Sequence, residues 1–156
     1  MKKISLIIII VFIILSCTDQ GARKNYDYTI TNNSGVTVEI IPYYEQGGID
    51  LSKKIILQNG QSLNANKQVH PLESLPLTMA ELISKSENIF LSKVVIVFDN
   101  IKKSIYSNDC TYNNGVSLNC DIRNIFLIQY NNEQTEVYTI TPEDYQNAVD
   151  CGGNCN

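Results

Sequence analysis

Apolar and polar residues alternate along two segments, residues 26–31 and 36–40, on either side of an Asn-Ser-Gly sequence at positions 33–35. An alternation of period two places the apolar side chains on one face of a β-strand. Asn, Ser and Gly favour tight turns because they tolerate the backbone conformations that turns require. The pattern therefore predicts a β-hairpin with one buried face at the start of the domain.

A second group of segments lies between residues 53 and 107. Residues 53–58 end at an Asn59-Gly60 turn, and we expect another short strand there. Residues 65–88 contain two prolines and no regular spacing, so they predict only a short helical turn at residues 78–84. Residues 93–100 include a continuous β-branched run, which is typical of a central strand buried on both faces, and residues 102–107 should pair with it.

The last part of the chain predicts a hairpin followed by a helix. Residues 123–130 and 135–141 flank an Asn131-Asn132 turn and should form two paired strands. Thr141 then precedes a proline and two carboxylates, which predicts a helix from Pro142 to about Val149. Short strands with turns at close intervals predict an all-β fold, an antiparallel β-sandwich of about seven to nine strands with one short C-terminal helix.

The N-terminal residues 1–16 have a different pattern, because Lys2 and Lys3 precede an uninterrupted apolar run at residues 6–15. A basic start and a short apolar run are typical of a secretory signal peptide. As a helix these ten residues would rise only about 15 Å, whereas the hydrocarbon core of a bilayer is about 30 Å thick. A removable signal peptide is therefore favoured over a permanent membrane span.

A small residue stands directly before a cysteine at the end of that run, in the sequence Ile14-Leu15-Ser16-Cys17. This segment resembles the lipobox of bacterial lipoproteins, and the general pattern is similar to small envelope lipoproteins of Bacteroidota. The resemblance implies that Cys17 carries a diacylglyceryl group and that a peptidase removes residues 1–16. Two or more acyl chains would hold the protein on a bilayer. Residues 17–25 would be the lipidated cysteine and a flexible spacer, and residues 26–156 a single β-sandwich domain.

The same resemblance implies a location in the bacterial cell envelope. In lipoproteins of enteric-type bacteria an Asp directly after the lipidated cysteine favours retention in the inner membrane. Here Thr18 takes that place and Asp19 follows it. This order favours the outer membrane, on either its periplasmic or its surface face.

The charge of the chain disfavours nucleic-acid binding. The whole sequence has a formal charge of -4, and loss of Lys2 and Lys3 with the leader makes it about -6. The basic pairs Lys53-Lys54 and Lys102-Lys103 are isolated from other basic residues. Such a surface repels phosphate backbones, so we expect no nucleic-acid partner.

The sequence has five cysteines, an odd number for a protein in an oxidising compartment. If Cys17 carries lipid, Cys110, Cys120, Cys151 and Cys155 remain as an even set. Short loops that contain glycine favour bonds between Cys110 and Cys120 and between Cys151 and Cys155. The alternative is that the C-terminal pair is linked to the 110–120 loop.

Residues that could support catalysis or metal binding are few. The only histidine, His70, precedes Pro71 and is interpreted as a surface loop residue, because a lone imidazole cannot form the common catalytic zinc sites. Asp99, Asp109 and Asp121 could approach a calcium ion, but their spacing matches no calcium loop and favours solvated turns. We expect no catalytic residues, no metal and no cofactor.

The tyrosines are the remaining candidates for binding. Tyr43 and Tyr44, beside a two-glycine loop, could form an aromatic patch with Tyr106 and Tyr112, although packing at the core or the sandwich edge is the competing interpretation. The sequence therefore predicts a non-catalytic binding module for a glycan, a peptide or an envelope partner. A structural, assembly or inhibitor subunit of an envelope complex is the alternative, and a hydrolase is disfavoured.

Overall fold

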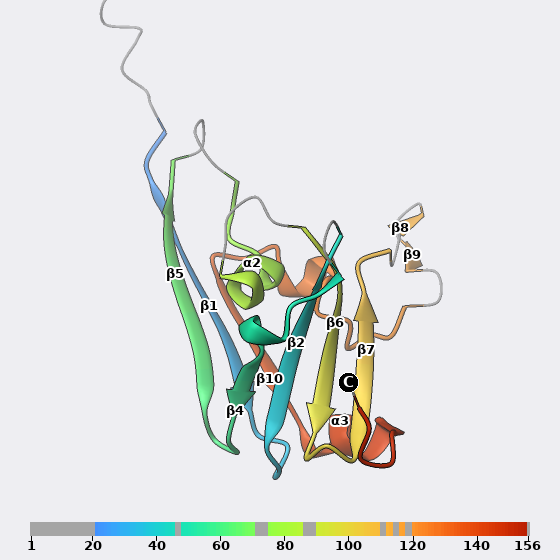
Figure 1. Cartoon of the computed structure of the whole chain (residues 1–156). Helices are drawn as coiled ribbons and strands as arrows, with labels where there is room; N and C mark the ends of the chain where they lie inside the picture. Colours follow the sequence, from blue (N-terminus) through green and yellow to red (C-terminus); the bar gives the residue numbers. More distant parts are fainter. Residues whose placement is uncertain are drawn as a thin grey trace, which may run out of the picture.

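The structure is a computed structural model of the 156-residue chain. It describes residues 21–45, 48–70, 75–85, 90–109, 112–113, 116–117 and 120–155 (Figure 1). The predicted signal peptide and the lipidated Cys17 lie outside the described residues. Within the described part of the chain, no helix is long and apolar enough to cross a membrane.

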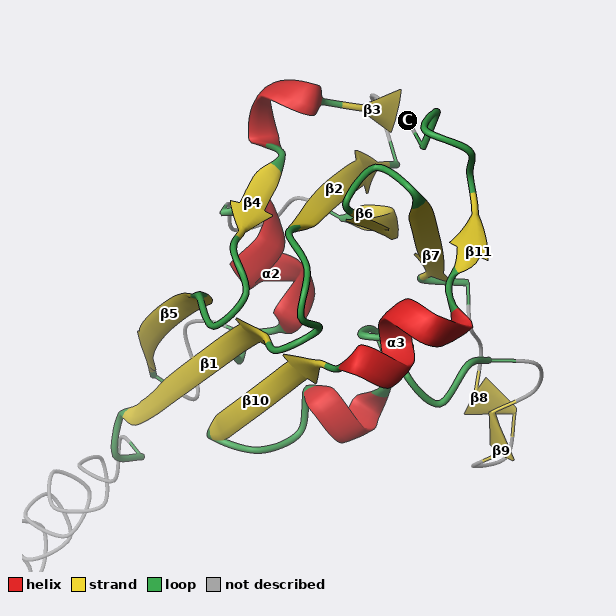
Figure 2. Ribbon diagram, turned by 90° about the horizontal axis from the view of Figure 1, so that it is seen from below, coloured by secondary structure: helices red, strands yellow, loops and turns green. Residues whose placement is uncertain are grey.

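The described strands form two facing sheets, which confirms the predicted all-β, sandwich-like fold (Figure 2). The three-stranded sheet has the order β10 (Thr135–Ile140), β1 (Lys24–Asn32) and β5 (Ser62–Val69). The six-stranded sheet contains β11 (Val149–Asp150), β7 (Lys102–Ser107), β6 (Leu91–Phe98), β2 (Val38–Tyr44) and β3 (Gly48–Ile49), with β4 (Ile55–Leu57) also paired to β2. A separate two-stranded element joins β8 (Tyr112–Asn113) and β9 (Val116–Ser117).

Among the described residues, two short α-helices lie beside the sheets, α2 (Met79–Ser84) and α3 (Pro142–Asn147). Helix α2 contacts β2 and β5, whereas α3 contacts β7, so each helix adjoins the sandwich on a different side (Figure 2). Both were predicted, and both begin as expected at a threonine. The Thr78 side chain accepts a hydrogen bond from the third residue of α2, and Thr141 forms a reciprocal capping box with Asp144 in α3.

The hydrophobic core lies between the two sheets, where alternate residues of each strand point inward. Tyr28 and Ile30 of β1 meet Ile40 of β2 and Ile96 and Phe98 of β6, and all five are buried. The predicted central strand is confirmed, because β6 pairs with both β2 and β7. Residues 102–107 pair with it as predicted.

The predicted first hairpin is wrong, because β1 and β2 belong to different sheets. Each strand does bury one face, as its alternation predicts, but β1 and β2 face the common core from opposite sheets. Asn32 stabilises the crossing between the sheets. Its buried side-chain amide donates to the Val36 and Leu57 carbonyls at 2.8 Å each, and its oxygen accepts hydrogen bonds from the backbone N–H and the hydroxyl of Ser34.

The predicted last hairpin is also wrong. Residues 123–130 form turns and a 3-10 helix, Ile128–Tyr130, and β10 instead pairs in parallel with β1, which makes this pair an exception to the antiparallel pattern. Asn124 and Asn131 explain the irregular backbone, because their side chains take the hydrogen bonds that a strand ladder would use. Asn131 donates to the carbonyls of Ile125 and Leu127.

Strand β5 falls partly within the region predicted to be irregular. Its inward positions carry Leu63 and Ala65, and its exposed positions carry small polar residues, so its apolar signal is weak. The predicted strand at 53–58 exists as the shorter β4, followed by a turn in which Gly60 has a φ of 84°. That conformation is the one that favours glycine. The turn leads from β4 into the opposite sheet.

Candidate functional site

Apolar side chains cover both faces of the six-stranded sheet. The face turned away from the core, called here the outer face, is defined by strand register, because paired residues point to the same side. One row pairs Ile49 with Tyr43 and Lys93, the next pairs Ile41 with Val95 and Ile105, and a third joins Ile56, Glu39, Val97, Lys103 and Val149. The outer face is therefore largely aliphatic.

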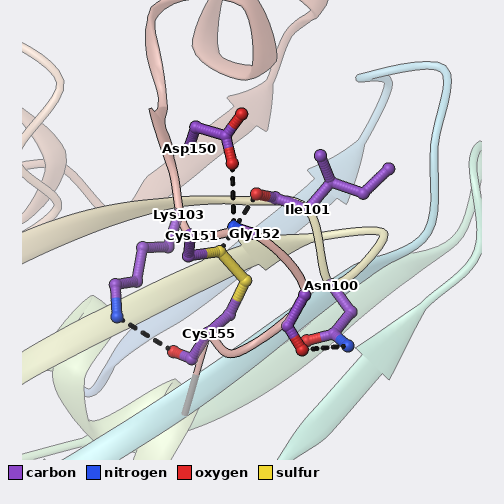
Figure 3. The surroundings of a disulfide bond; sticks show 8 residues. Asn100, Ile101, Lys103, Asp150, Cys151, Gly152 and Cys155 are labelled. Carbon is purple, nitrogen blue, oxygen red and sulfur yellow. Dashed lines mark hydrogen bonds between the residues drawn. A yellow bond between two sulfur atoms is a disulfide. The ribbon is translucent and has the colours of Figure 1, made fainter.

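The C-terminal residues 151–155, called here the strap, cover the middle of the outer face (Figure 3). A disulfide joins Cys151 to Cys155, as predicted, which rules out the alternative that linked these cysteines to the 110–120 loop. Cys155 is only 2% exposed and packs with the buried side chains of Ile41, Val95 and Val97. The strap thus explains how a central strand is buried on both of its faces.

Hydrogen bonds attach the strap to the turn between β6 and β7 (Figure 3). The backbone N–H of Cys151 donates to the Ile101 carbonyl at 2.8 Å, and the Asn100 amide donates to the Gly153 carbonyl at 3.0 Å. Lys103 donates to the Cys155 carbonyl at 3.3 Å. Because Gly153 has a φ of 82°, this tight return of the chain depends on glycine.

Several aliphatic side chains of the outer face remain exposed beside the strap. Ile105 is 55% exposed, and Ile49, Ile56 and Val149 are also exposed. Tyr43 is half-buried against the cluster under the strap. The Lys93 ammonium lies 4.2 Å from the centroid of the Tyr43 ring, which fixes a cation against the aromatic face.

The charges on the outer face differ in sign from the charge of the whole chain. Lys93 and Lys103 lie on it, whereas Glu39 is paired with Lys54 at 2.9 Å. The outer face therefore carries a local excess of positive charge in a protein with a formal charge of -4. Such a surface attracts carboxylates at its edges while its centre excludes water.

The four tyrosines proposed as an aromatic patch do not come together. Tyr43 lies on the outer face, whereas Tyr44 packs against the inner core with a buried hydroxyl, and this burial raises its pKa. Tyr106 is buried in the same core, and burial raises its pKa as well. The side chain of Tyr112 lies outside the described residues. Of the four, only Tyr43 is placed on the candidate site.

A second cluster of polar side chains centres on Arg123, beside α3. Its guanidinium forms a bidentate pair with the buried Asp144 carboxylate, at 2.8 and 2.9 Å, and also donates to the Thr139 carbonyl. The same group lies over the Tyr138 ring, 4.6 Å from its centroid. These contacts satisfy Arg123 within the protein, so the cluster ties the 120–130 segment to α3 and β10 and has a structural role.

The other candidate residues are placed as follows. Cys120 is disulfide-bonded, while its predicted partner Cys110 lies outside the described residues. His70 follows the end of β5 and is half-buried. Within the ranges that the structure describes, no three His, Cys, Asp or Glu side chains gather into a group that could hold a metal ion.

Sequence reasoning missed the outer face as a site, although it contained two signals. The continuous run at 93–100 required a cover on its second face, and the chain segment that supplies it was not identified. Adjacent Ile105 and Tyr106 also show that both faces of β7 carry apolar side chains.

Comparison with known proteins gives no relative, since no protein-family profile, curated protein or solved structure matches the chain.

Proposed function

We propose that this protein is a lipid-anchored envelope protein that binds a partner through the outer face of its six-stranded sheet and performs no catalysis. The lipid on Cys17 would hold the domain at a membrane, in the outer membrane by the order of residues after the cysteine. The outer face would supply the binding surface. Neither function requires a cofactor or metal.

The observation that carries this proposal is a contrast between the two sheets. The solvent side of the three-stranded sheet is polar, with Thr29 bonded to Asn64 and Thr31 bonded to Ser62, both at 2.9 Å. This is the ordinary composition of a sheet face turned to water. The outer face of the six-stranded sheet instead presents aliphatic residues, including the exposed Ile105. Several exposed aliphatic side chains on one face of a sheet favour an interaction site over an ordinary solvated face.

The chemistry of the outer face favours a protein or peptide partner over a glycan. Aliphatic side chains dominate it, and Tyr43 is its only aromatic residue among those described. It therefore offers apolar area but few hydrogen-bonding groups for sugar hydroxyls. Lys93 and Lys103 complement carboxylates, so the fitting partner presents aliphatic side chains flanked by Asp or Glu.

Intact mass measurement of the mature protein from its native host tests the anchor. We expect cleavage before Cys17, an added mass of acyl chains and the loss of four hydrogens to two disulfides. A mature chain that begins elsewhere or lacks acyl mass would remove the anchor from the proposal, without affecting the binding face.

Photo-crosslinking in native membranes tests the binding face. A photoreactive amino acid replaces Ile105 in one variant and Val137 in another, because both are aliphatic strand residues, 55% and 57% exposed, on different sheets. We expect a discrete crosslinked partner from position 105 but not from position 137. Lys93→Glu should reduce the yield of crosslinking from position 105. Equal crosslinking from both positions would count against the outer face.

A structural or assembly role is a second candidate, favoured by one observation. Strand β5 lies at the edge of the three-stranded sheet and is eight residues long. An edge of this length can pair with a strand of another chain. A photoreactive residue at Gln68 on β5 would then crosslink a partner when position 105 does not.

A further inference from the structure

Three strands define the end of the sandwich at which the N-terminus enters. Strand β1 begins there, and its first residue, Lys24, pairs with Val69 at the end of β5. Strand β10 begins at the same end because it runs parallel to β1. Figure 1 shows that β6 also begins at this end, whereas α3 lies at the opposite end. This part of the molecule is called here the N-terminal end.

Two large apolar side chains are highly exposed at the N-terminal end. Leu75, which follows β5 and precedes α2, is 77% exposed, and Phe90, which directly precedes β6, is 68% exposed. Both segments are tied to the N-terminal end. The N–H of Met79 donates to the side chain of Asn131, ahead of β10, and the Phe90 carbonyl accepts from the N–H of Glu45 after β2.

The length of chain before β1 limits how far this end can lie from a membrane. Cys17 precedes Lys24 by seven positions. Because an extended chain spans at most about 3.6 Å per residue, the tether reaches no more than about 25 Å. A lipid on Cys17 would therefore hold the N-terminal end close to the bilayer.

We propose that Leu75 and Phe90 insert into the lipid surface to which Cys17 is anchored, so that the N-terminal end is a membrane-docking surface. This inference rests on the lipid anchor of the proposed function. Amphipathic insertion of exposed apolar residues adds to the affinity supplied by acyl chains. The strands would then stand away from the membrane, with the outer face turned sideways and the strap accessible to a partner.

The absence of tryptophan from the sequence permits a direct test. The full-length lipid-bearing protein is prepared with Phe90→Trp, or with Val149→Trp as the control, since Val149 is 69% exposed and lies on β11, which pairs with the start of β7 away from the N-terminal end. Each is reconstituted into phosphatidylcholine vesicles with brominated acyl chains. These vesicles carry no net charge, so the experiment isolates apolar insertion.

We expect the emission of the tryptophan at position 90 to shift to shorter wavelength and to be quenched by the brominated chains. The tryptophan at position 149 should emit as in water. Adding Leu75→Ser to the Phe90→Trp protein should reduce the quenching, whereas adding Val149→Ser should leave it unchanged, since Val149 is also exposed but lies on β11, away from the N-terminal end.

The outcomes separate the two proposals. Protein that floats with the vesicles while position 90 stays unquenched would overturn the docking surface and leave the anchor intact. Equal quenching at positions 90 and 149 would also overturn it, because the domain would then have no fixed orientation. Protein that does not float with the vesicles at all would overturn the anchor and the docking surface together.

Discussion

Removal of the disulfide in the strap tests whether this bond keeps residues 151–155 packed on the outer face. The perturbation is the double substitution Cys151→Ser and Cys155→Ser. The bond closes a short loop with a sequence separation of 4, and such a loop removes about 2 kcal/mol of chain entropy from the unfolded state. Cys155 is also buried, so a polar hydroxyl in its place adds a desolvation cost of about 1 kcal/mol or more.

We therefore expect the free energy of unfolding to fall by about 2 to 4 kcal/mol. Urea titration followed by far-UV circular dichroism measures this loss. A dye that fluoresces on apolar surfaces should bind more strongly to the native variant, because release of the strap exposes Ile41, Val95 and Val97. The control is Ile105→Ser, an exposed position beside the strap, for which we expect a change of about 0.5 kcal/mol or less.

The strap interpretation would be wrong if the double substitution changed stability no more than the control and left dye binding unchanged. In that case the cluster around Cys155 would not depend on the covalent link. Loss of stability without increased dye binding would show that the link matters but that the strap remains in place through its hydrogen bonds to the β6–β7 turn.

Three further predictions concern the buried polar groups. Arg123→Gln removes the bidentate partner of the buried Asp144 carboxylate and should lower the free energy of unfolding, measured by urea titration, by about 2 to 3 kcal/mol. This loss is smaller than for a fully buried pair because the guanidinium is partly exposed. A loss below about 0.5 kcal/mol would contradict the prediction. Asn32→Ala removes the amide that donates to the Val36 carbonyl and to the buried Leu57 carbonyl, and it should lower the free energy of unfolding by about 2 to 4 kcal/mol. The exposed neighbour Asn33→Ala should change it by less than about 0.5 kcal/mol. Burial raises the pKa of Tyr28 to about 12 from 10.0, so the unfolded chain loses this proton first and stability should fall by roughly 2 kcal/mol between pH 10 and pH 12. Tyr28→Phe should make the free energy of unfolding depend less steeply on pH in this range. An unchanged dependence on pH would show that Tyr28 does not cause the fall.

Local signals in the sequence predicted single elements well. Thr141, Pro142 and Asp144 predicted α3 because capping chemistry is confined to one turn of chain. The β-branched run at 93–100 predicted a central strand because burial on both faces leaves no polar positions. Neither inference required knowledge of distant residues.

Strand pairing could not be predicted in the same way. A period of two shows which face of a strand is buried, but not which strand lies beside it. Residues 26–31 and 36–40 fit a hairpin and fit two sheets facing one core equally well. Here Asn32 decides between them, since its side chain bonds to Val36 and to Leu57, which is distant in sequence.

The candidate site could not be predicted from the sequence for a similar reason. The sequence predicted the Cys151–Cys155 bond and the doubly buried strand as separate features, and only the fold shows that the first covers the second. Ile105 and Val137 have comparable exposure, and it is strand order that places one on an apolar face and the other on a polar one.

The central claim is that the outer face of the six-stranded sheet binds a partner. The most direct measurement is the apparent size of the lipid-bearing protein in gently solubilised native membranes, compared between wild type, Ile105→Asp and Val137→Asp. We predict that wild type and Val137→Asp migrate in a complex larger than the single chain, whereas Ile105→Asp migrates as the single chain. Retention of the larger complex by Ile105→Asp would contradict the claim.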